Sequence, residues 1–114
     1  MAIPHPIPDT LADLIAERFK ALGEPMRIRI LDHLRDGSSS VGAIAHAVGT
    51  SQQNVSKHLA LLHSMGLVSR ERQGNAVNYS IADQSVFDMC EHVCGSLRRQ
   101  LGEMQALVSG EASR

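Results

Sequence analysis

Residues 50–66 read TSQQNVSKHLALLHSMG, a segment that follows Gly49 and ends on a second glycine. Glycines commonly close helices, so we expect one helix to end before this segment and another to end with it. The capping-box spacing between Thr50 and Gln53 predicts that Thr50 caps the new helix, which begins near Ser51. The apolar residues at helical spacing, expected on its buried side, are Val55, Leu59 and Leu62.

A short helix and a tight turn precede that segment. The short helix is expected from about Val41 to Val48, with Gly49 closing it. Two helices joined by a turn of a few residues have the layout of a helix-turn-helix. Residues 41–65 are therefore predicted to form a helix-turn-helix whose later helix, running to about Met65, reads DNA.

The N-terminal part of the chain predicts an extended arm and then two helices. Three prolines lie within residues 1–8, which we expect to form the arm. Asp9 or Thr10 is expected to cap the first helix, which stops at Gly23, and Pro25 suits the first turn of the second helix. The residues at helical spacing expected on the buried sides are Leu11, Leu14, Ile15, Phe19, Leu22, Ile28, Leu31 and Leu34, with Ile30 beside the second stripe.

Two strands and a long helix are expected after the reading helix. Residues 67–72 and 76–81 predict the strands, and Gln73-Gly74-Asn75 supplies turn chemistry between them. A cap at Asp83 or Ser85 is expected to open the last helix. The small and apolar residues of this helix, whose spacing is typical of a helix-pairing seam, are Val86, Cys90, Cys94, Leu97, Leu101, Met104 and Val108.

Together these elements predict a mainly α (α+β) fold, a winged helix-turn-helix with five helices and a two-stranded β-wing. The 114 residues suit one domain, expected over residues 9–108 and followed by a frayed tail at residues 109–114. No stretch is apolar enough over a sufficient length to span a bilayer, and the N-terminus does not resemble a secretory signal. The expected compartment is the cytoplasm.

The overall charge does not favour nucleic-acid binding. The formal net charge is −1 at pH 7, whereas domains that bind nucleic acid are commonly basic. Aromatic residues make up 3% of the chain, which argues against a single-strand binder that stacks bases. A hypothesis of DNA binding must therefore rest on local charge and on the polar side of the reading helix.

That polar side carries side chains that can read base edges. Gln can pair bidentately with adenine, Lys can reach guanine, and each good pair discriminates by ~1–3 kcal/mol. The residues expected to be exposed on the reading helix are Gln52, Gln53, Ser56, Lys57 and His63. On the wing, Arg70, Arg72 and Asn75 are expected to contact phosphate or the minor groove. For any single residue the alternative is a solvated surface, and an apolar or acidic face would instead indicate a module for protein contacts.

Three separated motifs occur in a fixed order along the chain. They are LGEPMRIRIL at residues 22–31, SQQNVSKHLALL at residues 51–62 with Gly66-Leu67-Val68 after it, and RQGNAVNY at residues 72–79. In this order they resemble the ArsR/SmtB family of bacterial repressors, over about residues 14–100. The resemblance implies a winged-helix homodimer, joined through its first and last helices, that represses an operon until an inducer lowers its affinity for operator DNA.

The resemblance also implies roles for single residues. The family's reading-helix positions that match this sequence are Gln52, Gln53, Ser56 and Lys57. His58 matches a frequent family histidine and joins the candidates for DNA contact, although its expected direction is toward the flank of the helix. In this reading the bound partner is a double-stranded DNA operator.

Metal or metalloid sensing is a further implication of the resemblance, yet the two best-known family sites are incomplete here. The positions that match a cysteine site in the third helix are Ser40, Gly42 and Ala45. None of these supplies a thiolate. The positions that match a carboxylate–histidine site on the last helix are Asp83, Ser85, Ser96 and Arg99. Only Asp83 fits.

Cys90 and Cys94 remain as candidate ligands on the seam. Residues four apart share one helix face, with ~5–6 Å between Cβ atoms, and a two-fold axis could bring together thiols from two chains. Thiolates suit As(III), Zn or another thiophilic ion, and thiols can also be oxidised reversibly. Packing alone is an equal alternative, because cysteine buries readily as a small hydrophobe. The repressor hypothesis stands in either case.

An enzyme is not expected. A thiol redox protein that uses Cys90 and Cys94 is the remaining alternative of a different class. Redox cysteines favour helix N-termini, where the thiol pKa is lowered, whereas these two are predicted to lie in the middle of a helix.

Overall fold

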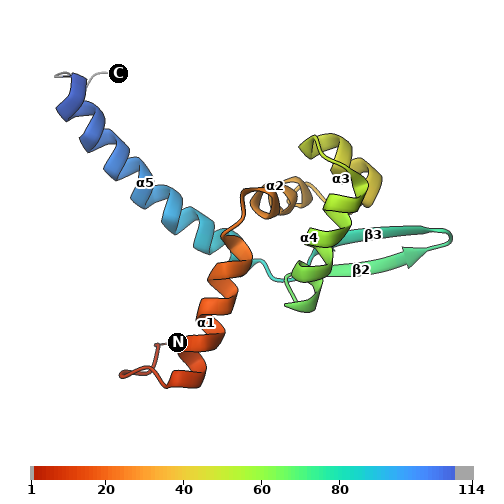
Figure 1. Cartoon of the computed structure of the whole chain (residues 1–114), viewed down its shortest axis with the longest axis horizontal. Helices are drawn as coiled ribbons and strands as arrows, with labels where there is room; N and C mark the ends of the chain where they lie inside the picture. The colour runs from red at the N-terminus through yellow and green to blue at the C-terminus, as the bar shows by residue number, and fades with distance from the viewer. Residues whose placement is uncertain (1, 110–114) are drawn as a thin grey trace. The chain divides into compact units, whose positions relative to one another are not determined.

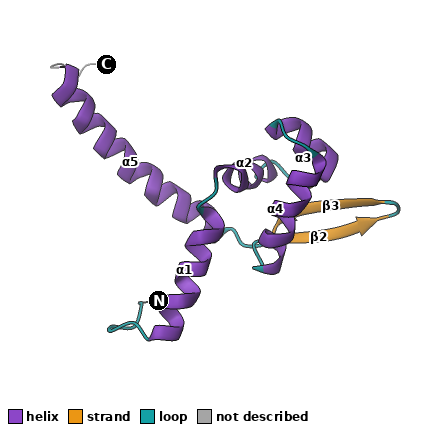
Figure 2. Cartoon of the chain, viewed as in Figure 1, coloured by secondary structure: helices purple, strands orange, loops and turns teal. Residues whose placement is uncertain are grey.

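The structure, a computed structural model, describes the backbone of residues 2–109 and the side chains of residues 2–105 (Figures 1 and 2). In chain order the elements are α1 (Asp9–Leu22), α2 (Pro25–Leu34), β1 (Ser39–Ser40), α3 (Val41–Val48), α4 (Gln52–Ser64), β2 (Val68–Gln73), β3 (Ala76–Ile81) and α5 (Ser85–Ser109). They fall into two compact units, of which the first ends at Asp83 and the second holds α5. In the predicted N-terminal arm, residues 2–8 hold no helix or strand. Of the predicted tail, Ser109 is the last residue of α5 and residues 110–114 lie outside the described part.

The first two helices differ from the prediction at their caps and on one face. Neither Asp9 nor Thr10 caps α1, since both are helical and the N-cap position is Pro8, which has no side-chain acceptor. Glu24 caps α2, where its carboxylate accepts a hydrogen bond of 3.2 Å from the Met26 N–H. Pro25 is the first helical residue, as predicted.

The predicted apolar stripes of α1 and α2 are only partly buried. Leu14 and Phe19 are 63% and 58% exposed. On α2 the prediction for Ile28 is wrong: it is 43% exposed, whereas Ile30 is fully buried. The helix is rotated so that Ile30, Leu31 and Leu34 face the rest of the unit.

The predicted helix-turn-helix is present in α3 and α4. Ser40 caps α3 by accepting the Ala43 N–H at 3.1 Å, and Gly49 ends α3 in the left-handed conformation, with φ of 75°. Only glycine adopts this conformation without strain, so the turn requires it. The α4 N-cap is Ser51 rather than the predicted Thr50, since the Ser51 hydroxyl accepts the Asn54 N–H at 3.1 Å.

The predicted two-stranded wing is present as β2 and β3, and an unpredicted third strand extends it to an antiparallel sheet of order β1-β3-β2. The unpredicted strand β1 is two serines long and pairs Ser39 with Tyr79 and Ser40 with Asn78. Strands β2 and β3 pair from Val68 with Ile81 to Gln73 with Ala76, which leaves a two-residue loop that starts at Gly74. The resulting β2–β3 ribbon projects past α3 and α4 (Figure 1).

The core of the first unit lies where α2, α3, α4 and the base of the ribbon meet. Its largest fully buried side chains are Ile30, Leu31, Ile44, Val55, Leu59, Leu62, Leu67 and Val68. Burying one such side chain contributes ~1.5–3 kcal/mol, so this cluster fixes the position of α4 against its neighbours. The predicted inner side of α4 is confirmed, since Val55, Leu59 and Leu62 are each 0% exposed.

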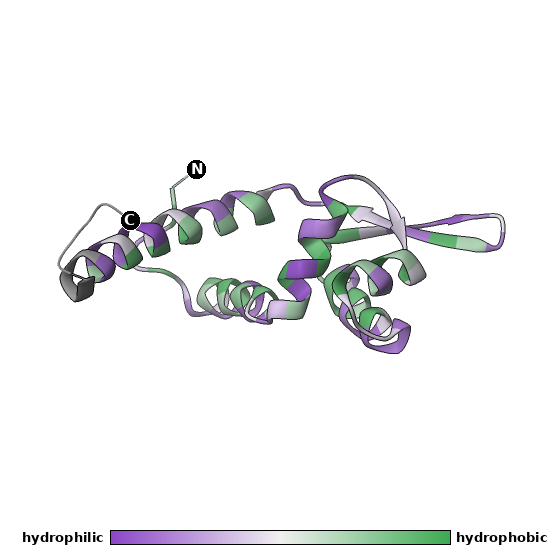
Figure 3. Ribbon diagram, turned by 90° about the horizontal axis from the view of Figure 1, so that it is seen from above, coloured by the Kyte–Doolittle hydropathy of each residue, from purple (hydrophilic) through white to green (hydrophobic). Residues whose placement is uncertain are grey.

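Helix α5 spans the predicted length and mixes apolar with polar residues along its course, as the helix ending at the point marked C shows (Figure 3). Four of its large apolar side chains are about half exposed or more: Val93, Leu97, Leu101 and Met104. Val108, also predicted on the seam, lies outside the described side chains. No helix in the described part of the chain could cross a membrane.

Candidate nucleic-acid interface

The N-terminus of α4 is held by two neighbouring hydroxyl groups. Asn54 donates its backbone N–H to Ser51 Oγ and its side-chain Nδ2 to Thr50 Oγ1, each at 3.1 Å. Thr50 thus supports the cap from outside, although it is not the cap itself. The remaining free N–H groups and the positive end of the helix dipole face outward, and this arrangement favours phosphate oxygens.

The two sides of α4 differ sharply in chemistry. The predicted reading residues Gln52, Gln53, Ser56 and Lys57 are all exposed, and so is His63, which was predicted on the same side of the helix. The helix contains no acidic residue, so no carboxylate on it would repel a DNA backbone. A face that offers amides, a hydroxyl and one ammonium group can donate to and accept from base edges.

The side chain of Gln52 lies against α3 at Gly42. A Cβ atom built on Gly42 would stand 3.4 Å from Gln52 Nε2 and 3.9 Å from its Cδ. The glycine therefore leaves the Gln52 amide room next to the first turn of α3. The sequence contains no signal for this contact, because it depends on how α3 and α4 cross.

His58 lies on the inner side of α4. It is 8% exposed, and its Nδ1 atom is buried without a hydrogen-bond partner in the described structure. Burial lowers the pKa of the imidazole, and the nearby charges of Arg27 and Lys57 lower this pKa further, against a smaller opposite effect of Glu24. His58 is thus a neutral packing residue, and its burial removes it from the surface that could contact DNA.

The ribbon separates its charges between two faces. Because alternate residues of a strand share a face, Arg70 and Arg72 lie on the face that buries Val68, and Glu71 lies on the other. His63, Arg70, Arg72 and Val77 line a pocket of about 330 Å³, hereafter the helix–ribbon pocket. Asn75 is exposed in the loop at the tip.

The two thiols of α5 are free, with Cys90 partly buried and Cys94 exposed. Within the described residues no group of three or more His, Cys, Asp or Glu side chains could hold a metal ion. One chain therefore offers two thiolates at most. Asp83, the one residue that matched a family metal site, instead pairs with Arg18 at 3.2 Å.

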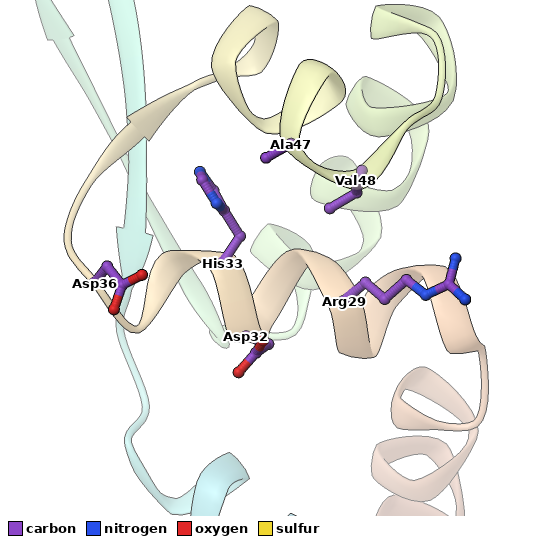
Figure 4. Close-up of a pocket in the computed structure, with 6 residues that line it drawn as sticks. All are labelled: Arg29, Asp32, His33, Asp36, Ala47 and Val48. Carbon is purple, nitrogen blue, oxygen red and sulfur yellow. The ribbon is translucent and has the colours of Figure 1, made fainter.

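A second pocket, of about 430 Å³, lies between α2 and α3 (Figure 4). Its polar side chains do not converge: the His33 ring points toward α3, while Asp32 points away from it on the other side of α2. His33 Nε2 lies 3.2 Å from Ser39 Oγ, and Asp32 pairs with Arg35 at 3.4 Å. These side chains are engaged locally and present no joint ligand set.

Comparison with known proteins agrees with this architecture. The sequence profile of bacterial regulatory proteins of the arsR family matches residues 24–70. The HTH-type transcriptional regulator Rv0081 of Mycobacterium tuberculosis is 37% identical over 101 residues, covering 88% of this chain and 89% of that protein. The chain belongs to the ArsR family. It is a DNA-binding transcriptional regulator of that family, as the sequence motifs predicted.

Solved structures and a further relative support the ArsR assignment. The crystal structure of Rv0081 superposes with a TM-score of 0.76, covering 85% of this chain and 98% of that one. The NMR structure of the homodimeric winged helix-turn-helix domain of Mb0332 from Mycobacterium bovis has a TM-score of 0.72 at 33% identity, covering 88% and 95%. A Streptomyces lividans protein named "Probable mercury resistance operon repressor" is 39% identical over 84 residues, 73% of this chain and 66% of that protein.

Proposed function

We propose that this ArsR-family protein is a sequence-specific repressor whose α4 enters the major groove of an operator. The two-sided character of α4 is the observation that supports this most, because its buried side anchors the helix and its exposed side is mainly polar and basic, with Ala60 and Leu61 as its apolar residues. The proposed base contacts are Gln52, Gln53, Ser56 and Lys57. Arg70, Arg72 and Asn75 of the ribbon contact the adjacent DNA, and His58 acts by packing alone.

The proposed active form is a homodimer joined through α1 and α5. The support is the apolar surface that these helices expose in the single chain, at Leu14, Phe19, Leu97 and Leu101. A two-fold dimer presents two α4 helices to half-sites one helical turn apart, ~34–36 Å. Because its proposed ligand is a DNA operator, the proposed compartment is the cytoplasm, and the proposal includes no catalytic step.

The test is binding of the purified full-length chain to its own promoter region, followed by selection from random duplexes. The proposal expects a pseudo-palindromic site with salt-dependent affinity. Gln53→Ala should weaken the selected site more than unrelated DNA, whereas the matched change Gln100→Ala on α5 should not. Failure to bind both the promoter and any selected sequence would contradict the repressor assignment.

We further propose that Cys90 and Cys94 bind a thiophilic inducer across the dimer. The two thiols share one face of α5, and two chains would offer up to four thiolates, the ligands that As(III), zinc and copper(I) prefer. A relative named for mercury resistance is consistent with soft-metal chemistry. A coupling of ~1–3 kcal/mol between this site and α4 would lower the affinity for the operator several-fold to a hundred-fold.

Operator release measured with arsenite, zinc, copper(I) and hydrogen peroxide tests this second proposal. Release should disappear in Cys90→Ser and Cys94→Ser and persist in Ser96→Ala. If none of the four changes the operator affinity of the wild type, the cysteines serve only packing, and repression without thiol sensing remains.

A further inference from the structure

The helix–ribbon pocket stands between the two elements proposed to touch DNA. Its walls are His63 in the last turn of α4 and, from the ribbon, Arg70, Arg72 and Val77. Val77 pairs with Arg72 in the β2–β3 register, so the two strands contribute neighbouring side chains. The pocket thus has one apolar lining residue and three side chains that can donate hydrogen bonds.

The charge around the pocket is of one sign. No acidic side chain lines it, and the nearest acid along the strand, Glu71, lies on the opposite face of the ribbon. Among the described residues the side chain of neither Arg70 nor Arg72 forms an ion pair or hydrogen bond. Two guanidinium groups without a partner beside a histidine N–H form a site for an anion with several acceptor oxygens.

The C-terminus of α4 does not oppose an anion strongly. A helix end normally exposes carbonyl oxygens that repel negative charge. Here the Leu61, Leu62 and His63 carbonyls accept hydrogen bonds from Met65, Leu67 and Gly66, at 3.2, 3.0 and 3.0 Å. Ser64 Oγ also donates to the Leu61 carbonyl, at 2.7 Å. The carbonyls are therefore occupied within the turn.

We infer that the helix–ribbon pocket holds one phosphodiester group of the operator backbone. This inference rests on the proposed function. The sequence left two contacts open for the ribbon arginines, the phosphate backbone and the minor groove, and the inference chooses the phosphate backbone. Arg70 and Arg72 pair with the phosphate charge, and His63 donates an N–H to one of its oxygens. The pocket is set back from the ribbon tip and adjoins α4, so its ligand is the backbone beside the groove that α4 occupies. His63 is then a DNA contact of the positioning kind rather than a base reader.

The first experiment measures operator affinity of the full-length chain by fluorescence anisotropy between about 50 and 200 mM salt, a range in which phosphate contacts change affinity strongly. The double variant Arg70→Ala/Arg72→Ala should reduce the slope of log affinity against log salt by ~0.9 per subunit, the value for one phosphate. It should weaken operator and unrelated duplex by the same factor. Arg29→Ala, which removes the same charge type from the α2–α3 pocket, should leave the slope unchanged.

His63 is tested by a truncation and a conservative change. His63→Ala should weaken the operator and unrelated DNA equally, and His63→Gln, which keeps an N–H donor, should restore most of the loss. Urea unfolding midpoints that match the wild type exclude misfolding as the cause. If His63→Ala binds as the wild type does, the role of His63 is refuted.

Methylphosphonate substitution of single operator phosphates locates the contact. For the wild type, substitution at one phosphate position in each half-site should lower operator affinity. For the double variant, the same substitution should cause no further loss of affinity. Additive losses would overturn the inference, as would a changed A·T preference, which would indicate minor-groove reading. Saturable binding of inorganic phosphate at His63, with operator affinity unaffected by the double variant, would show a small-anion site instead. If the wild type binds no DNA, the proposed function fails; an unchanged salt slope with intact operator binding refutes the pocket alone.

Discussion

At the scale of single residues, the reading surface depends on position 42 being a glycine. Gly42 has no Cβ, and the Gln52 amide occupies the adjacent space. A Cβ at 3.4 Å from Nε2 would be an ordinary contact, whereas a branched side chain would occupy the volume of the amide. The size of residue 42 therefore controls the direction of Gln52.

A substitution series at Gly42 tests this control. Gly42→Leu should displace the Gln52 amide and remove its base discrimination, worth ~1–3 kcal/mol, while Gly42→Ala should nearly preserve it. Relative affinities for operators altered one base pair at a time would report the loss. In a Gln52→Ala background the leucine should have no further effect on specificity. A loss of the same size in that background would mean that Gly42 acts elsewhere.

His58 gives the second prediction for a single residue, a pH dependence of stability. Burial and the neighbouring Arg27 lower its pKa in the folded protein below the ordinary value of ~6.5. The unfolded chain therefore binds a proton on His58 at a higher pH than the folded chain does. Stability from the neutral imidazole is present above pH ~6.5 and is lost as pH falls toward the lower folded pKa.

The urea midpoint of the wild type should thus fall more steeply between pH 7 and 5 than that of His58→Gln. His46→Gln, at an exposed histidine, is the matched control and should follow the wild type. Parallel curves for wild type and His58→Gln would show that the buried ring does not control the acid response.

Residue periodicity predicts which side chains of α4 are exposed, yet it cannot predict what they touch. Val55, Leu59 and Leu62 were placed correctly because every fourth or third residue returns to one face. Thr50 and Ser51 are both competent caps, and only the backbone geometry shows that Ser51 accepts the Asn54 N–H. His58 follows Lys57 in sequence but is buried, because it lies at the edge of the polar side of α4, near the Arg27 and Glu24 charges at the start of α2.

At the scale of elements, the helices could be predicted and the smallest strand could not. Each helix has an apolar repeat bounded by Gly, Pro or a hydroxyl residue, and these signals are local. Strand β1 has two serines and no apolar alternation, so its pairing with Tyr79 and Asn78 depends on where α2 and α3 bring it. The ribbon itself was predicted to within one residue at β2, because its loop has glycine at the required position.

The cap of α4 yields the prediction for an element. Ser51→Ala removes the acceptor of the Asn54 N–H and should destabilise the chain by about 1 kcal/mol. Equilibrium urea unfolding measures this cost. Ser38→Ala, at an exposed serine before β1, should change stability by less than ~0.5 kcal/mol. Equal effects of the two changes would be inconsistent with a capping role for Ser51.

At the scale of the whole molecule, the single chain exposes an apolar surface that its sequence places on a seam. Leu97 and Leu101 are 49% and 60% exposed on α5, at the spacing of paired helices. A second chain that covers this surface would explain why α1 and α5 are amphipathic but incompletely buried here. The sequences of α1 and α5 predict the apolar stripe on each helix. No local pattern in them identifies the surface that covers it.

Leu97→Glu/Leu101→Glu should therefore give a monomer in sedimentation velocity. Operator affinity should fall by about 10²-fold or more, since two half-sites are no longer bound together. Ser96→Glu, which adds a charge off the seam of the same helix, should remain a dimer with wild-type affinity. A dimeric double variant would place the subunit interface elsewhere.

The separation of charge on the ribbon has a consequence for how the protein finds its site. The formal net charge of the chain is −1, and two of its arginines, Arg70 and Arg72, line one small pocket beside α4. Affinity for arbitrary DNA grows with the number of phosphates neutralised, so a protein with few such contacts is held weakly by the bulk of a chromosome. Fewer molecules are then sequestered on irrelevant sequence, and we expect a small cellular copy number to keep the operator occupied.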